Sequence, residues 1–351
     1  MPRIHSIEML LFVALSFVSC HSYRYIGIET YNPATITFPP EIRTVMIVNN
    51  AAQQPDCIGH QDYDIFNLIA TDSIISLSVD SVAYLFCMAL GKTIAEAPLF
   101  DDVRLCNDTL RYDSLFYISR PFSANTVVSL CDEYGVDALI SLDKLYFKTM
   151  LFSKNSDYYN LYYVLVEIIG ELRMFYPEAQ VAYTIPFTDS LIMKSDNGFF
   201  YTMEYETFTV QDVHDAIRVL SELTGQKISA NFVPFWTDEK RWYYTSMSSE
   251  WRRAAAYALA EKWDAAAKEW LQLYGVASQW KQKARLASNL ALCHEIKGDF
   301  PKAIEYATTA DSLFTKHVDE DNKCRKMQNE YLTLLKKRAE DDKTLSTQLK
   351  E

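Results

Sequence analysis

Two stretches near the carboxyl end decide the fold: EWRRAAAYALAEKWDAAAKEWLQLYG, from Glu250 to Gly275, and ARLASNLALCHEIKGDFPKAIEYATTADSLF, from Ala284 to Phe314. Small and aromatic residues recur in the two stretches at one constant offset. The matched positions are Ala254 with Ala291, Ala266 with Ala303, and Trp263 with Phe300. A small residue lets a second helix approach closely, and an aromatic residue at the start of that helix fills the space between the pair. The pattern therefore predicts two helical hairpins.

This pattern resembles the tetratricopeptide repeat, a helix–turn–helix unit of about 34 residues. The residues that carry the resemblance are Ala254, Tyr257, Trp263, Ala266, Trp270, Leu290, Ala291, Gly298, Phe300, Ala303 and Ala310. The offset is longer than that period by about three residues, and two copies are recognisable where about three are usual. Residues 322–349 are expected to add a capping helix. An ordinary helical hairpin with alanines at the contact is the alternative, and either reading predicts an all-α domain over residues 246–351.

Charge and composition exclude some classes of partner. The chain has 351 residues and a net charge of −12, with no basic stripe, which argues against nucleic acid as a main partner. Only 9 residues are glycine, so a glycine-rich phosphate loop is not expected. No metalloprotease helix motif and no nucleophile-elbow motif occurs. We therefore predict no catalytic, cofactor-binding or metal-binding residue, and we expect the protein not to be an enzyme.

The first residues, MPRIHSIEMLLFVALSFVSC, read as an export signal. The apolar run from Met9 to Val18 is too short to cross a bilayer as a mature helix. A short apolar run, a small residue and then Cys20 resembles a bacterial lipoprotein signal, in which the cysteine becomes the lipidated first residue. Phe17 stands where leucine is more usual, and a general secretory signal or a buried strand is the alternative. The resemblance implies a signal peptide over residues 1–19 and lipidation of Cys20.

Residues 20–245 are expected to form an α/β sheet domain. Apolar β-branched runs and helical periodicities alternate here and then give way to long alternating segments. The expected elements are a strand at 42–49, a helix at 72–97, a strand at 110–119, a helix at 123–134, a strand at 136–142, an antiparallel meander over 145–187, and a helix at 209–224 that ends at Gly225. The fold class is therefore α+β, with an α/β domain, a meander and carboxyl-terminal helical hairpins.

Aromatic residues concentrate between Tyr146 and Tyr244. Exposed aromatic side chains in a groove would suit a glycan or a peptide. Sheets also bury aromatic residues well, so internal packing explains the same composition. The region therefore supports an alternative function as a glycan-binding or glycan-processing protein.

The helix and strand over Val127–Leu142 resemble the α/β domain of envelope-assembly lipoproteins of the curli-secretion and Tol type. The order of signal, sheet body, VPFWTDEKRWYY segment and repeat tail is similar to a family of Bacteroidota lipoproteins with a carboxyl-terminal tetratricopeptide-like region. The resemblance implies a location in the cell envelope and does not assign an activity. Because no acidic run follows Cys20, we expect a lipid-anchored protein at the outer membrane that faces the periplasm.

An aspartate followed by serine or threonine and then an aliphatic residue is similar to the O-glycosylation acceptor of exported Bacteroidota proteins. Thr109 and Ser190 are the candidates that fall in expected loops. The same sequence also forms ordinary turns and helix caps.

Together these features predict a membrane-tethered, non-enzymatic scaffold of the cell envelope. Its helical repeats would present a concave surface to an envelope protein partner, and the lipid at Cys20 would be its membrane anchor. Glycan binding or processing by residues 146–244 is the alternative.

Overall fold

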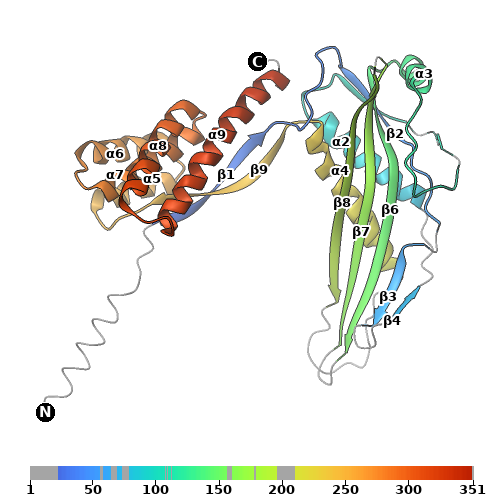
Figure 1. Ribbon diagram of the computed structural model, residues 1–351, viewed down its shortest axis with the longest axis horizontal. Coiled ribbons are helices and arrows are strands. Elements are labelled where there is room, and N and C mark those ends of the chain that lie inside the picture. Colours follow the sequence, from blue (N-terminus) through green and yellow to red (C-terminus); the bar gives the residue numbers. More distant parts are fainter. Residues whose placement is uncertain are drawn as a thin grey trace. The chain divides into compact units, whose positions relative to one another are not determined.

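The computed structural model describes residues 23–349, apart from 56–57, 65–68, 73–78, 107, 109, 112, 156–159, 178 and 196–209. These residues form two compact units (Figure 1). The sheet unit contains residues 33–234 and the described residues from Thr347, and the helical unit contains residues 23–32 and 235–346. The expected α+β class, with a strand-rich amino-terminal part and a carboxyl-terminal run of helices, is confirmed.

The sheet unit is built on one mixed sheet of seven strands. Its elements are β2 (Thr44–Asn49), β3 (His60–Asp64), β4 (Ile69–Asp72), α2 (Val79–Glu96), β5 (Asp102–Cys106), α3 (Ala124–Tyr134), β6 (Ala138–Asn155), β7 (Asn160–Tyr176), β8 (Ala179–Ser195), α4 (Val210–Ile228) and the 3₁₀ turn η1 (Ser229–Asn231). The strand order is β4-β3-β6-β2-β5, and β7 and β8 continue the sheet from β6. Strand β2 is parallel to β5 and to β6, whereas β6, β7 and β8 form an antiparallel meander.

Strand β2 lies at the centre of the parallel part and is covered on both faces. Val45 and Ile47 pack in the same core as α2, and Met46 and Val48 pack in the core that contains α3. Side chains of a strand alternate between faces, so an uninterrupted apolar run predicts a strand buried on both sides. The chain passes from β2 through α2 to β5, and then through α3 to β6 on the other side of β2. The strand order therefore reverses at β2.

The meander predicted over 145–187 is confirmed, and its outer strands β6 and β8 extend beyond that range. Strand β6 runs through the expected break after Leu142 because a register shift between Leu142 and Lys144 lets pairing with β7 continue. Figure 1 shows α2 and α4 lying along these long strands. Gly170 of β7 lies opposite Phe187 of β8, and a Cβ at Gly170 would come within 2.2 Å of the Phe187 ring. The glycine therefore makes room for an aromatic ring that stacks on Phe86 of α2, with ring centroids 5.1 Å apart.

Two expectations for the sheet unit were wrong. Helix α4 continues past Gly225 to Ile228, because this glycine lies against the backbone of α2 and does not end the helix. The described residues of 110–119 form a loop and not a strand. The Arg111 guanidinium donates to the carbonyls of Leu115 and Ile118, at 2.9 and 2.8 Å, and so folds the segment around itself.

The helical unit begins with a two-stranded antiparallel ribbon. Its elements are β1 (Tyr23–Asn32), β9 (Phe235–Tyr244), α5 (Ser249–Leu259), α6 (Trp263–Val276), α7 (Trp280–Ile296), α8 (Phe300–His317) and α9 (Lys323–Leu349). Tyr243 and Tyr244 at the end of β9 are buried in the core formed with the helices. The Asn289 side chain of α7 accepts from the Tyr244 backbone N–H at 2.6 Å and donates to its carbonyl at 2.8 Å. This amide satisfies the backbone as a neighbouring strand would.

The predicted helical hairpins are present as α5 with α6 and α7 with α8. The alanines at the matched positions are fully buried: Ala254, Ala266, Ala291 and Ala303. Helix α9 packs Tyr331 and Leu335 in the core that contains Ala291 and Ala303, as expected of the capping segment. The small residues therefore lie at helix contacts.

The division into units differs from the expected boundary between 20–245 and 246–351. Strands β1 and β9, at residues 23–32 and 235–244, belong to the helical unit. The physical reason is that the two strands pair along their full length and bury their aromatic end among the helices. The expected signal peptide at residues 1–19 lies outside the described residues.

Candidate functional site

The structure describes one of the three modification sites predicted from the sequence. Cys20 and Thr109 lie outside the described residues. Ser190 is exposed, as expected, but it lies within β8 and opposite Glu167 of β7, not in a loop. Its backbone N–H donates to the Asp189 carboxylate at 3.0 Å.

The described aromatic residues between Tyr146 and Tyr244 pack mostly into the hydrophobic cores of the two units. The buried ones are Phe147, Phe175, Phe187, Phe232, Tyr243 and Tyr244. Tyr183 and Trp236 are the large aromatics of this range that are well exposed among the described residues. Trp236 lines a concave surface, and that surface belongs to the helical unit.

This surface is a groove of about 650 Å³ between the ribbon, the α5–α6 turn, α7 and α9. The charged and aromatic residues that line the groove are Glu29, Trp236, Asp238, Glu261, Trp263 and Arg338, with Glu295 at its floor. Its volume lies within the range of about 300–1,000 Å³ that is usual for ligand sites.

Two carboxylates face each other across the ribbon in the groove. Glu29 of β1 is paired directly with Asp238 of β9, and both side chains are exposed. Residues directly opposite in an antiparallel pair have Cβ atoms about 4.5–5.5 Å apart, and like charges there destabilise the sheet. The ribbon therefore places two like charges opposite each other, with the exposed Lys240 at the next pair on the same face, and a further cation between the two carboxylates would be attracted by both.

A third exposed carboxylate comes from the turn between α5 and α6. Glu261 has a φ of 56°, and it is the one described residue other than glycine with a positive φ. An L-residue pays roughly 1–2 kcal/mol in this left-handed region, where glycine pays almost nothing. The turn therefore places a carboxylate at the groove where glycine would fit the backbone better.

Aromatic surfaces lie beside these charges. Trp236, 66% exposed, stacks on Tyr31 with ring centroids 4.8 Å apart. Trp263 is the first residue of α6 and is half-buried against the helical core. Tryptophan faces attract cations as well as apolar groups, so these rings complement the acidic residues.

The floor of the groove is a buried ion-pair network. The Glu295 side chain is fully buried and accepts from Arg241 Nε at 2.9 Å, from the Tyr331 hydroxyl at 2.7 Å, and from Arg338 Nη1. Burial lowers the pKa of Arg241, but the bonds and attraction of Glu295 and Glu239 outweigh it, so that pKa is raised overall. Burial and then Glu295 raise the pKa of the Tyr331 hydroxyl well above its usual range. The Arg338 guanidinium, which also lines the groove, is held in place by Glu295.

Two family models match the chain, and both carry descriptions without a function. A domain of unknown function (DUF8603) matches residues 42–244, more than half of the chain. The chain belongs to the DUF8603 family. A second domain of unknown function (DUF6340) matches residues 252–337, within the helical unit. No curated protein and no solved structure matches the chain.

In this member of the DUF8603 family the groove offers negative charge and aromatic surface. The described residues hold no cluster of three or more His, Cys, Asp or Glu side chains placed to bind a metal ion. No helix in the described part is long and apolar enough to cross a bilayer. The arrangement is suited to binding a positively charged group beside an aromatic one.

Sequence reasoning missed the groove because its residues come from distant segments. Glu29 and Asp238 meet only because β1 pairs with β9, and a single sequence does not show that pairing. A signal was present in the ten-residue extended segments Tyr23–Asn32 and Phe235–Tyr244, which have equal length and are both rich in aromatic residues. Pairing those segments would have placed the two carboxylates opposite each other.

Proposed function

We propose that this protein is a lipid-anchored lipoprotein of the cell envelope that acts as a non-enzymatic scaffold, holding a basic segment of a partner protein in the groove of its helical unit. The observation that carries the proposal is the direct opposition of Glu29 and Asp238 on an exposed ribbon. A Lys or Arg side chain placed between them would turn a repulsion into two attractions. The same charge disfavours nucleic acid as the partner.

The rest of the groove supports a peptide as the occupant. Trp236 and Trp263 offer faces on which a cationic or aromatic side chain can stack. Glu261 adds charge from a separate element, so the negative potential extends along the groove instead of resting on one pair. Below them the Glu295 side chain is held by Arg241, Arg338 and the Tyr331 hydroxyl, which gives the exposed carboxylates a rigid base.

A titration of the full chain with a short Lys- and Trp-containing peptide tests the proposal, read by tryptophan fluorescence and calorimetry. The double variant Glu29→Gln with Asp238→Asn should bind the peptide at least about tenfold more weakly, because about 1.4 kcal/mol of attraction corresponds to tenfold in affinity. The same variant should unfold at an equal or higher temperature, since it removes a like-charge pair.

The matched control is Glu340→Gln, which removes an exposed carboxylate on α9 that does not line the groove. This variant should bind the peptide like the wild type, and a peptide with Glu in place of Lys should not bind the wild type. If the control and the double variant lose the same amount of affinity for the peptide, the effect comes from the net charge of the protein and not from the groove. Unchanged binding in the double variant would overturn the assignment of the groove.

The proposed lipid anchor and membrane location are tested separately by metabolic labelling with a fatty acid. The wild type should incorporate the label and fractionate with the outer membrane, and Cys20→Ala should do neither, because that thiol is the proposed acyl acceptor. Equal labelling of both proteins, or of neither, would remove the lipid anchor while leaving the groove proposal intact.

Glycan binding is the second candidate, and Trp236 is the observation that favours it. Its exposed ring, stacked on Tyr31, could receive a sugar face in the same groove. Trp236→Ala should then abolish binding of cell-envelope oligosaccharides, whereas the Glu29 and Asp238 variants should leave that binding unchanged. If the protein binds the peptide and no oligosaccharide, the scaffold function is supported and glycan binding is excluded.

A further inference from the structure

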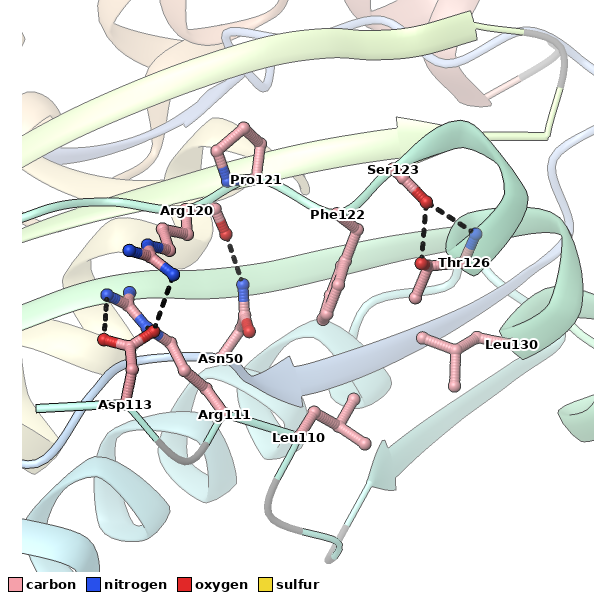
Figure 2. Close-up of a pocket in the computed structure, with 10 residues that line it drawn as sticks. All are labelled: Asn50, Leu110, Arg111, Asp113, Arg120, Pro121, Phe122, Ser123, Thr126 and Leu130. Atoms are coloured by element: carbon pink, nitrogen blue, oxygen red, sulfur yellow. Dashed lines mark hydrogen bonds and ion pairs between the residues drawn. The ribbon is translucent and has the colours of Figure 1, made fainter. Parts of the chain in front are cut away.

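The sheet unit contains a cavity of about 320 Å³ at the carboxyl edge of its parallel strands. Figure 2 shows that its lining comes from the residue after β2, the loop after β5 and the start of α3. The strand order reverses at β2. In open α/β sheets, ligands bind in the crevice outside the carboxyl ends of the strands at such a reversal. The cavity therefore lies where sheets of this kind place their ligands, and it is separate from the groove of the helical unit.

Hydrogen bonds to buried side chains hold the walls in place. Asn50, 3% exposed, donates from Nδ2 to the Arg120 carbonyl at 2.8 Å and to the Asp143 carboxylate at 2.9 Å. The Arg111 side chain is 5% exposed and holds the loop by its bonds to Leu115 and Ile118. A cavity with fixed walls loses little entropy when a ligand enters.

Positive charge is in excess at the cavity. Arg111 and Arg120 share a single carboxylate, that of Asp113, at 2.9 and 3.4 Å. The Arg120 side chain is 56% exposed, and its ion pair with Asp113 uses Nη1. The guanidinium of Arg120 therefore has donors left for a carboxylate ligand, and a planar guanidinium binds a carboxylate in bidentate fashion.

The nearby acidic residues do not cancel this charge at the cavity. Asp143 is fully buried behind the Asn50 amide, and Arg173 forms ion pairs with both Asp143 and Glu171. These two carboxylates lie outside the cavity lining. The first turn of α3 has no acidic residue, so its helix dipole adds to the positive potential near Ser123 and Thr126.

The remaining lining is apolar. Leu110, Phe122 and Leu130 line the cavity beside the charged groups, and Figure 2 shows the Phe122 ring between the arginine side and Leu130. Phe122 also packs on Phe175, with ring centroids 5.8 Å apart, which places its ring in the core that contains α3. An anionic head at Arg120 would thus have an apolar surface next to it for the rest of the ligand.

We propose that this cavity binds a small organic carboxylate with an apolar body, with the carboxylate held by Arg120 and the apolar body against Phe122. The site is independent of the proposed scaffold function. The fit is to a small molecule, because a cavity of this volume lies at the lower end of the range for ligand sites.

Calorimetry and ligand-observed NMR on the full chain test the site with phenylacetate, its neutral amide phenylacetamide, and inorganic phosphate as probes. Phenylacetate should bind with saturation. Arg120→Gln should weaken that binding about tenfold or more, because a charge-assisted bond is lost. Phe122→Leu should weaken it less, because it removes only part of the apolar surface. The matched control is Arg43→Gln, which removes an exposed arginine paired with Asp101 ahead of β2, and it should bind phenylacetate like the wild type.

Melting curves of each variant verify that it is folded before binding is compared. Failure of phenylacetate to bind, equal binding of the amide, or unchanged binding in Arg120→Gln would each overturn the proposal. Saturable binding of phosphate in place of phenylacetate would overturn the carboxylate assignment. None of these outcomes bears on the groove, which the peptide titration tests in the other unit.

Discussion

At the scale of single residues, Asp113 should make the stability of the protein depend on pH in the acid range. Hydrogen bonds from the Arg111 side chain and the Leu115 backbone lower the pKa of Asp113 to about 2, from 3.8 for a free side chain. A group whose pKa is lower in the folded protein contributes stability above its unfolded pKa and loses it as the pH falls to the folded pKa. The contribution of Asp113 is therefore complete above pH 3.8 and disappears towards pH 2.

The measurement is the melting temperature of the wild type and of Asp113→Asn as a function of pH. The two proteins should differ by a constant amount near neutral pH, and the difference should shrink between pH 3.8 and about 2. Comparison with the variant removes the contribution of other carboxylates that titrate in the same range. A difference that does not change over this range would show that the ion pair does not hold the carboxylate.

Glu261 offers a second prediction at this scale, because its backbone conformation favours glycine. Glu261→Gly should stabilise the helical unit by up to about 1 kcal/mol, since the strain of the left-handed conformation is relieved and the larger entropy of the unfolded glycine offsets part of the gain. The same variant should bind the basic peptide more weakly. Glu261→Gln is the control, because it removes the charge but keeps the strain, and it should weaken binding without raising stability in denaturant titrations.

At the scale of elements, the packing of α4 on α2 depends on Gly225. A Cβ at this position would lie 2.6 Å from the Phe86 carbonyl oxygen and 3.2 Å from the Leu90 nitrogen. Both contacts are with backbone, so the helices would have to separate. Gly225→Ala should therefore destabilise the sheet unit by roughly 1–2 kcal/mol, because overpacking exceeds the gain in helix propensity.

The matched comparison is Gly275→Ala in α6. Its added Cβ would meet nothing within 4 Å, so the substitution should be neutral or stabilise by up to about 1 kcal/mol. Thermal unfolding of both variants, followed by circular dichroism, distinguishes the two environments. A stabilised Gly225→Ala variant would show that α2 and α4 do not approach as closely as the structure places them.

The same glycine shows which parts of an element a sequence can predict. Local periodicity predicted α4 and α2, because each apolar face repeats within its own segment. It placed the end of α4 at Gly225, because glycine is the usual residue after a helix. The true reason for the glycine is contact with a helix more than a hundred residues earlier in the chain, and no local pattern reports that contact. The loop around Arg111 was missed for a similar reason, since its organising bonds come from one buried guanidinium.

The candidate sites differ in the same way: features set by nearby residues could be predicted from the sequence, and features set by distant residues could not. The alanine contacts of the hairpins were predictable because the two copies repeat within one region. The groove was not, because Glu29 and Asp238 belong to strands at opposite ends of the sheet unit in sequence. The cavity beside Arg120 depends on the strand order around β2, and that order becomes visible only when the sheet is assembled.

At the scale of the whole molecule, the place at which the chain can be cut into stable fragments depends on which unit contains β1 and β9. The two family models meet between residues 244 and 252, close to the boundary at residues 245 and 246 that the sequence predicts. The compact units instead place residues 23–32 and 235–244 with the helices. A fragment cut at the sequence boundary therefore lacks the ribbon and, with it, Tyr243 and Tyr244, which are buried in the helical core.

Expression of fragments 246–351 and 235–351 tests this division. The shorter fragment should be less stable by at least about 3 kcal/mol, because loss of large buried aromatic side chains costs about 3–5 kcal/mol each, and it should bind a hydrophobic dye through its exposed core. The longer fragment regains Tyr243, Tyr244 and the Asn289 bonds to the Tyr244 backbone. Addition of the peptide 23–32 should raise its melting temperature further, because the peptide completes the ribbon by pairing with β9. If fragment 246–351 melts at the same temperature as fragment 235–351 with the peptide bound, the helices fold without the ribbon. The ribbon would then not be a fixed part of the helical unit, and it could not serve as the groove wall that carries Glu29 and Asp238.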